Sequence, residues 1–187
     1  MIFLLNSDII ILNKYSMEAV KMFSVGDVVF YSTTGVCQVI SIGEPALKGL
    51  PTHVDYYTLQ PLSENHREMI YVPVDTKAFM RYAICDSQAQ QYIDMVDGIQ
   101  PQFPETRNPK GIQDYYSTLI NCYETPKLLQ VIVSLTSKKR EVQARNKHLN
   151  QTQTTFLRRA QEMVYNELAY ALGKSSREIA DIIESKI

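Results

Sequence analysis

The sequence predicts an α+β protein, in which a small N-terminal β-barrel is followed by an all-helical bundle. Two observations carry this prediction. From Met22 to Cys85, short apolar and aromatic segments alternate with turns that contain Gly or Pro, a pattern typical of small barrels. Beyond residue 110, apolar residues recur every three or four positions, as they do on the buried face of an amphipathic helix.

Residues 2–12 are apolar enough to raise the question of a signal peptide. However, Asp8 interrupts the apolar run, no basic residue precedes it, and no Ala-x-Ala cleavage site follows it. The run is also too short to span a bilayer. Because Met22 directly precedes the first predicted strand, we expect residues 1–21 to be an extension or an over-long start assignment. A strand or helix packed on the domain is the alternative.

The predicted β-domain opens with a hairpin over residues 22–40, in which Gly26 and Gly35 lie where the chain must bend. Residues 42–51 contain two Gly and two Pro and predict a loop. Two further strands follow over residues 54–59 and 68–74, both rich in β-branched and aromatic residues. Four or five short strands at this spacing predict an SH3-like or Tudor-like barrel.

The second of these later strands is predicted to lie at an edge, because Pro73 has no backbone N–H to donate to a neighbouring strand. An apolar strand at this position could merely close the barrel. Alternatively, its unpaired backbone groups could pair with a strand of a partner protein. The candidate partner-binding residues are Met69, Ile70, Tyr71, Val72 and Pro73.

Helices are predicted from residue 86 onward. Asp86 or Ser87 can cap a first helix that Gly98 ends. Residues 99–110 contain three prolines and no periodicity, so they predict a link into the second domain. The predicted units are therefore residues 22–85, a helix and linker over 86–110, and a helical domain over 111–187.

Within the helical domain, Thr125 and Pro126 begin an almost fully apolar segment, which predicts a central helix. A later amphipathic helix ends at Gly173. Ser175 and Glu178 then form a capping box for the last helix. Four or five helices with these apolar faces predict a compact bundle.

Composition favours a binding protein over an enzyme. Hydrophobic residues make up 45% of the chain and charged residues 21%, as in ordinary globular proteins. The histidines have no spaced metal-ligating partner, and the chain lacks a Gly-rich phosphate loop and a G-x-S-x-G motif. The sequence therefore nominates no catalytic residue, no metal and no cofactor.

The cysteines are three in number and widely spaced, so they fit neither a zinc site nor a disulfide framework. We expect buried free thiols in a reducing cytoplasm. The three are Cys37, Cys85 and Cys122.

The formal net charge of -1 hides an asymmetry along the chain. Residues 22–85 carry four basic and six acidic side chains, whereas residues 138–159 carry seven basic side chains and one acidic one, Glu141. Such a basic run can simply be a solvated helix surface that complements a helix C-terminus. Alternatively, it can neutralise phosphates without reading bases. The seven are Lys138, Lys139, Arg140, Arg145, Lys147, Arg158 and Arg159.

Several segments resemble the CarD family of bacterial transcription regulators. They are Met-Phe-x-Val-Gly-Asp-x-Val-x-Tyr at 22–31, Gly35-Val36, Tyr56-Tyr57 and Tyr71-Val-Pro-Val74. The same region is similar to the RNA-polymerase-interacting module of transcription–repair coupling factors. At the other end of the chain, residues 156–172 resemble the final long helix of the family, including its Glu-Leu-Ala.

The resemblance implies a non-enzymatic regulator of bacterial transcription. Its N-terminal domain would bind the RNA polymerase β subunit. Its helical domain would contact promoter DNA, without sequence specificity, at the upstream edge of the melted region and modulate the stability of the open complex. We expect a cytoplasmic monomer, associated with the nucleoid through RNA polymerase and not with a membrane. The alternative is an adaptor that binds polymerase or another protein without contacting DNA.

The chain also departs from the family pattern. Family members place a Trp at the start of the first helix of the second domain, as a wedge at the edge of the promoter bubble, whereas this chain has no Trp. The equivalent position falls at Asn108, Pro109 and Lys110, where Pro could act as an apolar wedge. These three residues and the seven basic ones form the candidate DNA-binding set. Tyr71 stands where the family often carries a basic residue.

Overall fold

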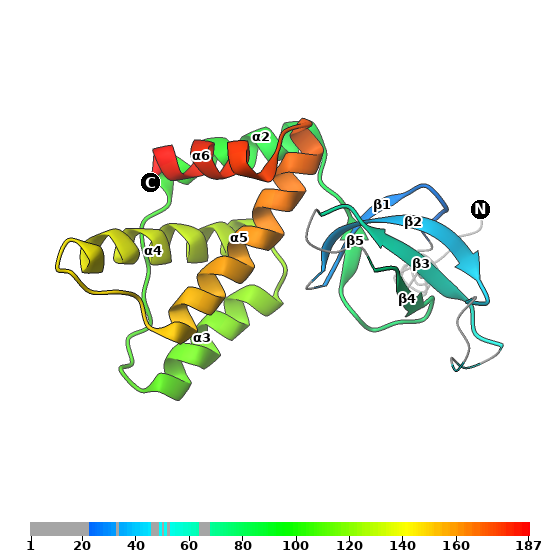
Figure 1. Ribbon diagram of the computed structural model, residues 1–187, viewed down its shortest axis with the longest axis horizontal. Helices are drawn as coiled ribbons and strands as arrows, with labels where there is room; N and C mark the ends of the chain where they lie inside the picture. Colours follow the sequence, from blue (N-terminus) through cyan, green and yellow to red (C-terminus); the bar gives the residue numbers. More distant parts are fainter. Residues whose placement is uncertain (1–22, 33, 46–48, 50, 52, 64–67) are drawn as a thin grey trace, which may run out of the picture.

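The computed structural model describes residues 23–32, 34–45, 49, 51, 53–63 and 68–187. A β-sheet lies at one end of the molecule and a helical bundle at the other, so the predicted α+β class is confirmed (Figure 1). The expected extension over residues 1–21 lies outside the described residues. Within the described part of the chain, no helix is both long and apolar enough to cross a membrane.

The sheet has five strands in the order β4-β3-β2-β1-β5, and every neighbouring pair is antiparallel. No pairing among the described residues joins β4 to β5, so the expected barrel is not closed. Helix α5 packs against β2, so apolar residues on the face of the sheet that points away from its own small core are buried by the helices. The strands are β1 Val28–Tyr31, β2 Gly35–Gly43, β3 Tyr56–Pro61, β4 Ile70–Pro73 and β5 Met80–Tyr82.

Alternating side chains in β1 and β2 serve two separate cores. Val29 and Cys37 face a small core within the curled sheet, while Phe30 and Val36 join the core of the helical bundle. This division follows from the two-residue period of a strand. A β-bulge at Ile40, between the paired residues Val39 and Ser41, bends the long strand β2.

Local signals in the sequence set most of the helix ends. Ser175 Oγ accepts a hydrogen bond from the Glu178 N–H at 3.2 Å, and Glu178 Oε2 accepts one from the Ser175 N–H at 2.8 Å, so the predicted capping box is confirmed. Gly173 ends α5 with φ 62°. The elements are α2 Asp86–Met95, the short 3-10 helix η1 Val96–Gly98, α3 Pro109–Asn121, α4 Thr125–Gln143, α5 Gln151–Leu172 and α6 Ser176–Lys186.

Two helix starts differ from the prediction by one residue. Helix α2 takes Cys85 as its N-cap rather than Asp86 or Ser87, and α4 takes Glu124 rather than Thr125. The central position of α4 is confirmed, because Leu128, Leu129 and residues 131–136 are all buried. Helix α5 packs against α2, α3, α4, α6 and β2, so it connects the bundle to the sheet.

Candidate functional site

A buried ion pair joins the sheet to the helices. Arg81 on β5 donates to both carboxylate oxygens of Glu167 on α5, at 2.5 Å to Oε1 and 2.9 Å to Oε2. The Glu167 side chain is 1% exposed and that of Arg81 is 22% exposed. Thr125 Oγ1 also donates to Glu167 Oε2 at 3.3 Å, so the buried carboxylate has two side-chain partners.

Aromatic contacts surround this ion pair. The Arg81 guanidinium lies 4.5 Å from the centre of the Phe30 ring. The rings of Phe79, which precedes β5, and Tyr123, which precedes α4, are stacked with their centres 5.0 Å apart. Ser32 Oγ donates to the Tyr123 hydroxyl at 3.1 Å. The junction is therefore packed as well as charged, and it holds the two halves in one relative arrangement.

Strand β4 lies at an edge of the sheet and pairs only with β3 among the described residues. The Val74 N–H donates to the Asp55 carbonyl at 2.9 Å. This bond shows that the backbone groups of Val74 point toward the chain that leads into β3. By the alternation of an antiparallel ladder, Val72 also faces β3, and Tyr71 and Pro73 face outward. Pro73 therefore sits where its missing N–H removes no bond to β3, and the predicted edge position is confirmed.

The five candidate partner-binding residues differ in what they can offer a partner. The Val72 side chain is buried in the sheet core, whereas the Met69 side chain is 51% exposed. The Pro73 carbonyl already accepts from the Thr76 N–H at 3.0 Å. Ile70 and Tyr71 are half-buried, and the Tyr71 backbone points outward. The accessible part of this edge is therefore centred on Tyr71, with Met69 beside it.

The candidate wedge position forms the start of α3. Asn108 is the N-cap, and its Oδ1 accepts from the Lys110 N–H at 3.0 Å. Pro109 occupies the first helical position, where a missing N–H has no consequence for the helix. Pro109 and Lys110 are both exposed. Asn108 and Pro109 thus account for the start of α3, and the side chains of residues 108–110 also reach solvent.

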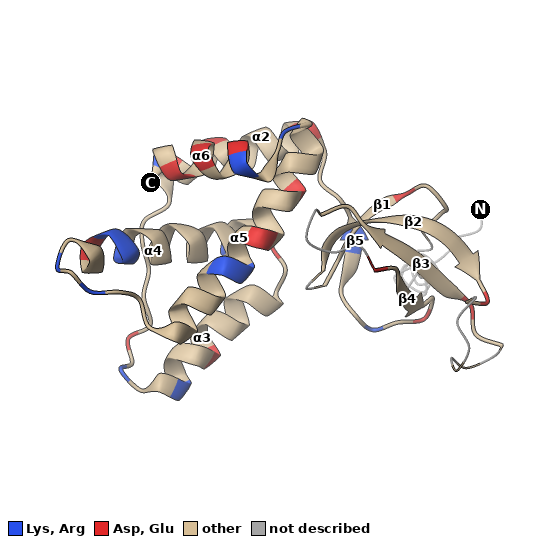
Figure 2. Ribbon diagram, viewed as in Figure 1, with Lys and Arg blue, Asp and Glu red and all other residues tan. Residues whose placement is uncertain are grey.

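Several of the seven basic residues are engaged within the protein. Arg140 Nη2 donates to the Glu184 carbonyl of α6 at 2.8 Å. Arg145 pairs with Glu141 at 3.0 Å, and Arg158 pairs with Glu162 at 3.7 Å. Figure 2 accordingly shows acidic positions (red) among the basic ones (blue) along the ribbons of α4 and α5. The run is therefore not an uncompensated positive surface.

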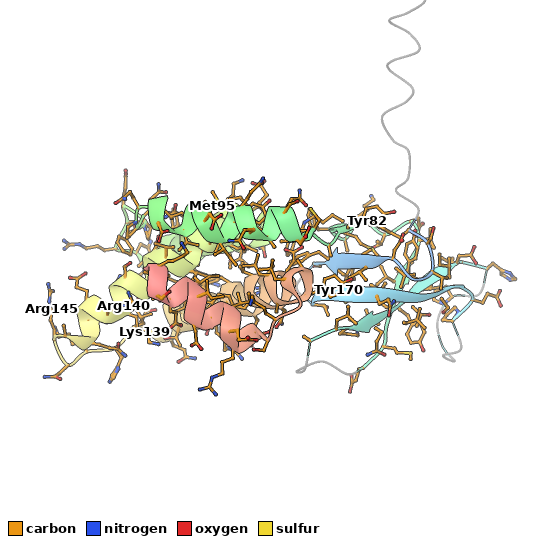
Figure 3. All side chains as sticks on the ribbon, turned by 90° about the horizontal axis from the view of Figure 1, so that it is seen from above. Tyr82, Met95, Lys139, Arg140, Arg145 and Tyr170 are labelled. Atoms are coloured by element: carbon orange, nitrogen blue, oxygen red, sulfur yellow. The ribbon has the colours of Figure 1, made fainter. Side chains whose placement is uncertain are left out.

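These basic residues fall into separate groups. Lys139, Arg140 and Arg145 lie at the end of the bundle farthest from the sheet (Figure 3). Lys139 of α4 and Arg158 of α5 line a common cavity of about 280 Å³ together with His148. Lys138 instead lies over the Phe103 ring, with its Nζ 5.6 Å from the ring centre. Lys147 and Arg159 belong neither to this cavity nor to the Phe103 contact. Lys147 is exposed.

The three thiols have different environments. Cys37 is fully buried, and burial raises the pKa of its thiol to about 12. Cys85 is exposed, so the expectation of a buried thiol is wrong at this position. Its side chain contacts Ser87 Oγ at 3.1 Å, and this hydrogen bond is the main cause that lowers the pKa of the Cys85 thiol. Cys85 is exposed because it is the N-cap residue of α2 and lies outside both cores.

Sequence reasoning missed two features. Glu167 occupies a position on the apolar face of α5, and a carboxylate there signals a buried basic partner, but the identity of Arg81 follows only from the fold. Phe103 lies in the predicted proline-rich link, yet its ring contacts Lys138 of α4 and remains 44% exposed. The feature of the sequence that could have indicated this contact is a single aromatic residue among three prolines.

An open antiparallel sheet with an accessible edge strand, packed on a helical bundle, belongs to the class of folds to which a partner can add a strand. Residues 23–83 match the family model of the CarD-like/TRCF RID domain, a non-catalytic domain that interacts with RNA polymerase. The predicted resemblance to the CarD-like/TRCF RID domain is thus confirmed over residues 23–83. The match spans the whole sheet and ends before α2. No curated protein sequence matches the chain.

Proposed function

We propose that the protein binds the RNA polymerase β subunit through strand β4 and contacts promoter DNA through its helical domain, thereby modulating the stability of the open complex. The observation that carries the proposal is the RID-domain match over a sheet whose β4 edge is accessible. A ligand that binds the open complex more tightly than the closed one shifts their equilibrium by that difference in affinity. We expect the protein to act as a cytoplasmic monomer beside polymerase.

Strand addition at β4 is the proposed docking mode. Since Tyr71 points its N–H and C=O away from β3, an extended segment of the β subunit can pair with it. Tyr71→Pro removes this outward donor without removing a bond to β3, while Tyr71→Ala removes only the side chain. We expect Tyr71→Pro to weaken binding of the isolated β lobe at least tenfold by calorimetry. Met95→Ala, an exposed change on α2, is the control. Equal affinities for all variants would refute strand addition.

The cavity of Lys139, His148 and Arg158 supports the proposed DNA contact, because it brings cations from α4 and α5 together. Contacts of this kind neutralise phosphates and give salt-dependent binding. We expect Lys139→Ala to weaken binding to a forked promoter duplex and to lower the slope of log K against log salt by about one. Arg145→Ala, which removes a cation already paired with Glu141, should have a smaller effect. Fluorescence anisotropy measures both.

The second candidate is an adaptor that binds polymerase without touching DNA. The ion pairs of Arg145 and Arg158 favour it, because they reduce the charge available for phosphates. Binding to the β lobe with no change in DNA anisotropy at micromolar protein would select this function. The lifetime of the open complex on a defined promoter, measured with and without the protein, then tests whether either mode affects initiation.

A further inference from the structure

A groove of about 900 Å³ lies between the segment 102–106 and helix α3. Its exposed lining is mainly apolar, with Phe103 and Pro104 from the segment and Tyr115 and Leu119 from α3. The groove adjoins the N-terminus of α3, which begins at Pro109. None of the predicted site residues lines it, so it is a feature of the fold beyond the candidate DNA-binding set.

The aromatic wall is held in place although Phe103 is 44% exposed. The Gln102 N–H donates to the buried hydroxyl of Ser134 on α4 at 2.8 Å. Gln130 Nε2 of the same helix donates to the Gln100 carbonyl at 2.8 Å. An exposed aromatic ring on a segment fixed at both Gln100 and Gln102 offers a rigid stacking surface, and a rigid surface binds a planar ligand with little loss of conformational entropy.

Close packing between the segment and α3 also shapes the groove. A Cβ atom at Gly111 would lie 2.6 Å from Thr106 Cγ2, so a larger residue at this position would require the Thr106 side chain to move. The groove is therefore formed before any ligand binds.

Charges of both signs surround the groove. Arg107 and Lys110, the exposed neighbours of the lining residues Thr106 and Gly111, lie on either side of Asn108 and Pro109, where α3 begins. Lys138 sits over the Phe103 ring. Two carboxylates, Glu105 and Asp114, line the groove itself. Cations beside an aromatic wall can bind the phosphates of a nucleotide whose base stacks on that wall. A carboxylate can accept a hydrogen bond from an exocyclic amino group of the base.

We propose that this groove binds one unpaired nucleobase of single-stranded DNA, stacked on Phe103 and Tyr115. The adjacent backbone phosphates would lie near Lys110 and Lys138. Asp114 or Glu105 would accept from an amino group, so cytosine and adenine would bind more tightly than thymine. The inference rests on the proposed DNA contact and identifies the part of the DNA that the helical domain holds.

The test uses the full chain and a forked duplex that carries 2-aminopurine at an unpaired position, with a second dye for anisotropy. The absence of Trp leaves the emission of 2-aminopurine undisturbed. We expect binding to quench this emission at least twofold, because stacking on an aromatic ring quenches it. Phe103→Ala should abolish the quenching and Phe103→Tyr should retain it. Tyr170→Ala, which removes an exposed aromatic ring near the sheet (Figure 3), is the matched control.

A second measurement compares forks whose unpaired base is cytosine or thymine. We expect about a fivefold preference for cytosine, and its loss in Asp114→Asn/Glu105→Gln. Anisotropy that reports binding without quenching overturns the base site and leaves the proposed DNA contact intact. No anisotropy change at all overturns both. If Phe103→Ala weakens binding of the polymerase lobe but not of DNA, the groove holds a protein segment and the base site is likewise overturned.

Discussion

Arg81 and Glu167, which are 86 residues apart in the sequence, form the ion pair that joins β5 to α5. One partner comes from the domain that matches the polymerase-interacting family and the other from the helical bundle. The pair therefore fixes how the edge strand β4 is placed relative to α3 and α4. The proposed simultaneous contacts with polymerase and DNA would gain from such a junction, because a geometry that matches the span of two sites raises the effective concentration of the second binding event.

Breaking this ion pair from one side is expected to be strongly destabilising. Arg81→Met leaves the Glu167 carboxylate buried with too few partners, at a cost of about 3 kcal/mol or more in the free energy of unfolding. The double variant Arg81→Met/Glu167→Leu removes the buried charge as well, and it should recover most of that loss. Urea unfolding measures each value.

Lys127→Met is the control for this series, since it breaks the exposed Lys127–Glu124 pair and should change stability by less than about 0.5 kcal/mol. A similar small effect for Arg81→Met would show that the junction does not depend on the ion pair.

Removing the hydroxyl of Tyr116 should not destabilise the protein. This hydroxyl is buried and has no hydrogen-bond partner among the described residues. Because an unsatisfied buried hydroxyl carries a desolvation penalty, Tyr116→Phe is expected to raise the free energy of unfolding by up to about 1 kcal/mol. Tyr57→Phe is the matched control: its hydroxyl accepts from the Phe23 N–H at 3.2 Å, so its loss should cost about 1 kcal/mol. Equal effects would contradict the assignment.

Stability should fall in alkaline solution, and Cys37 should be responsible for the first part of the decline. Burial raises the pKa of the folded thiol to about 12, while an unfolded thiol has a pKa of about 8.5. Its stabilising contribution is complete below the unfolded pKa and is lost as pH rises toward the folded pKa. The expected slope is about 1.4 kcal/mol per pH unit above pH of about 8.5.

Cys37→Ala should flatten this slope between pH of about 8.5 and 10. Above that range, Tyr116 and Tyr165, whose pKa values burial raises to about 12, add to the decline in both proteins. Unfolding curves at intervals of pH separate the two regions. An unchanged slope in Cys37→Ala would assign the decline to other groups.

The thiols should react at very different rates with a disulfide reagent. Cys85 is exposed and its pKa is lowered by the Ser87 hydrogen bond, so a larger fraction is thiolate at neutral pH. Cys37 is buried and its pKa is raised, so it should react only on unfolding. Absorbance should show one fast thiol in the native protein, absent in Cys85→Ser and slowed in Ser87→Ala. A fast thiol that survives in Cys85→Ser would instead belong to Cys122.

Local features of the fold were predictable because their causes are local. Gly173 and the Ser175–Glu178 box set the boundary between α5 and α6 through contacts within a few residues. Pro73 marked the edge strand because its missing N–H excludes it from a central one. The apolar segment after Pro126 identified the central helix α4 in the same way.

Long-range relationships were not predictable. The expected barrel stays open, because the edge strands β4 and β5 do not pair with each other among the described residues. The seven basic residues look like one cluster in the sequence, but Arg158 pairs with Glu162, one helical turn beyond that cluster, and Arg140 turns to the carbonyl of Glu184. The spatial grouping of these charges depends on how α4, α5 and α6 pack.

The sequence by itself determined the α+β class, the boundary between α5 and α6, the edge strand and the resemblance of residues 22–31 and 71–74 to a polymerase-interacting domain, because each depends on neighbouring residues or on a short pattern. Only the tertiary structure decided the partner of Glu167, the exposure of Cys85 and the groove beside Phe103. These depend on surfaces that meet after folding, and residue spacing along the chain carries little information about which surfaces will meet.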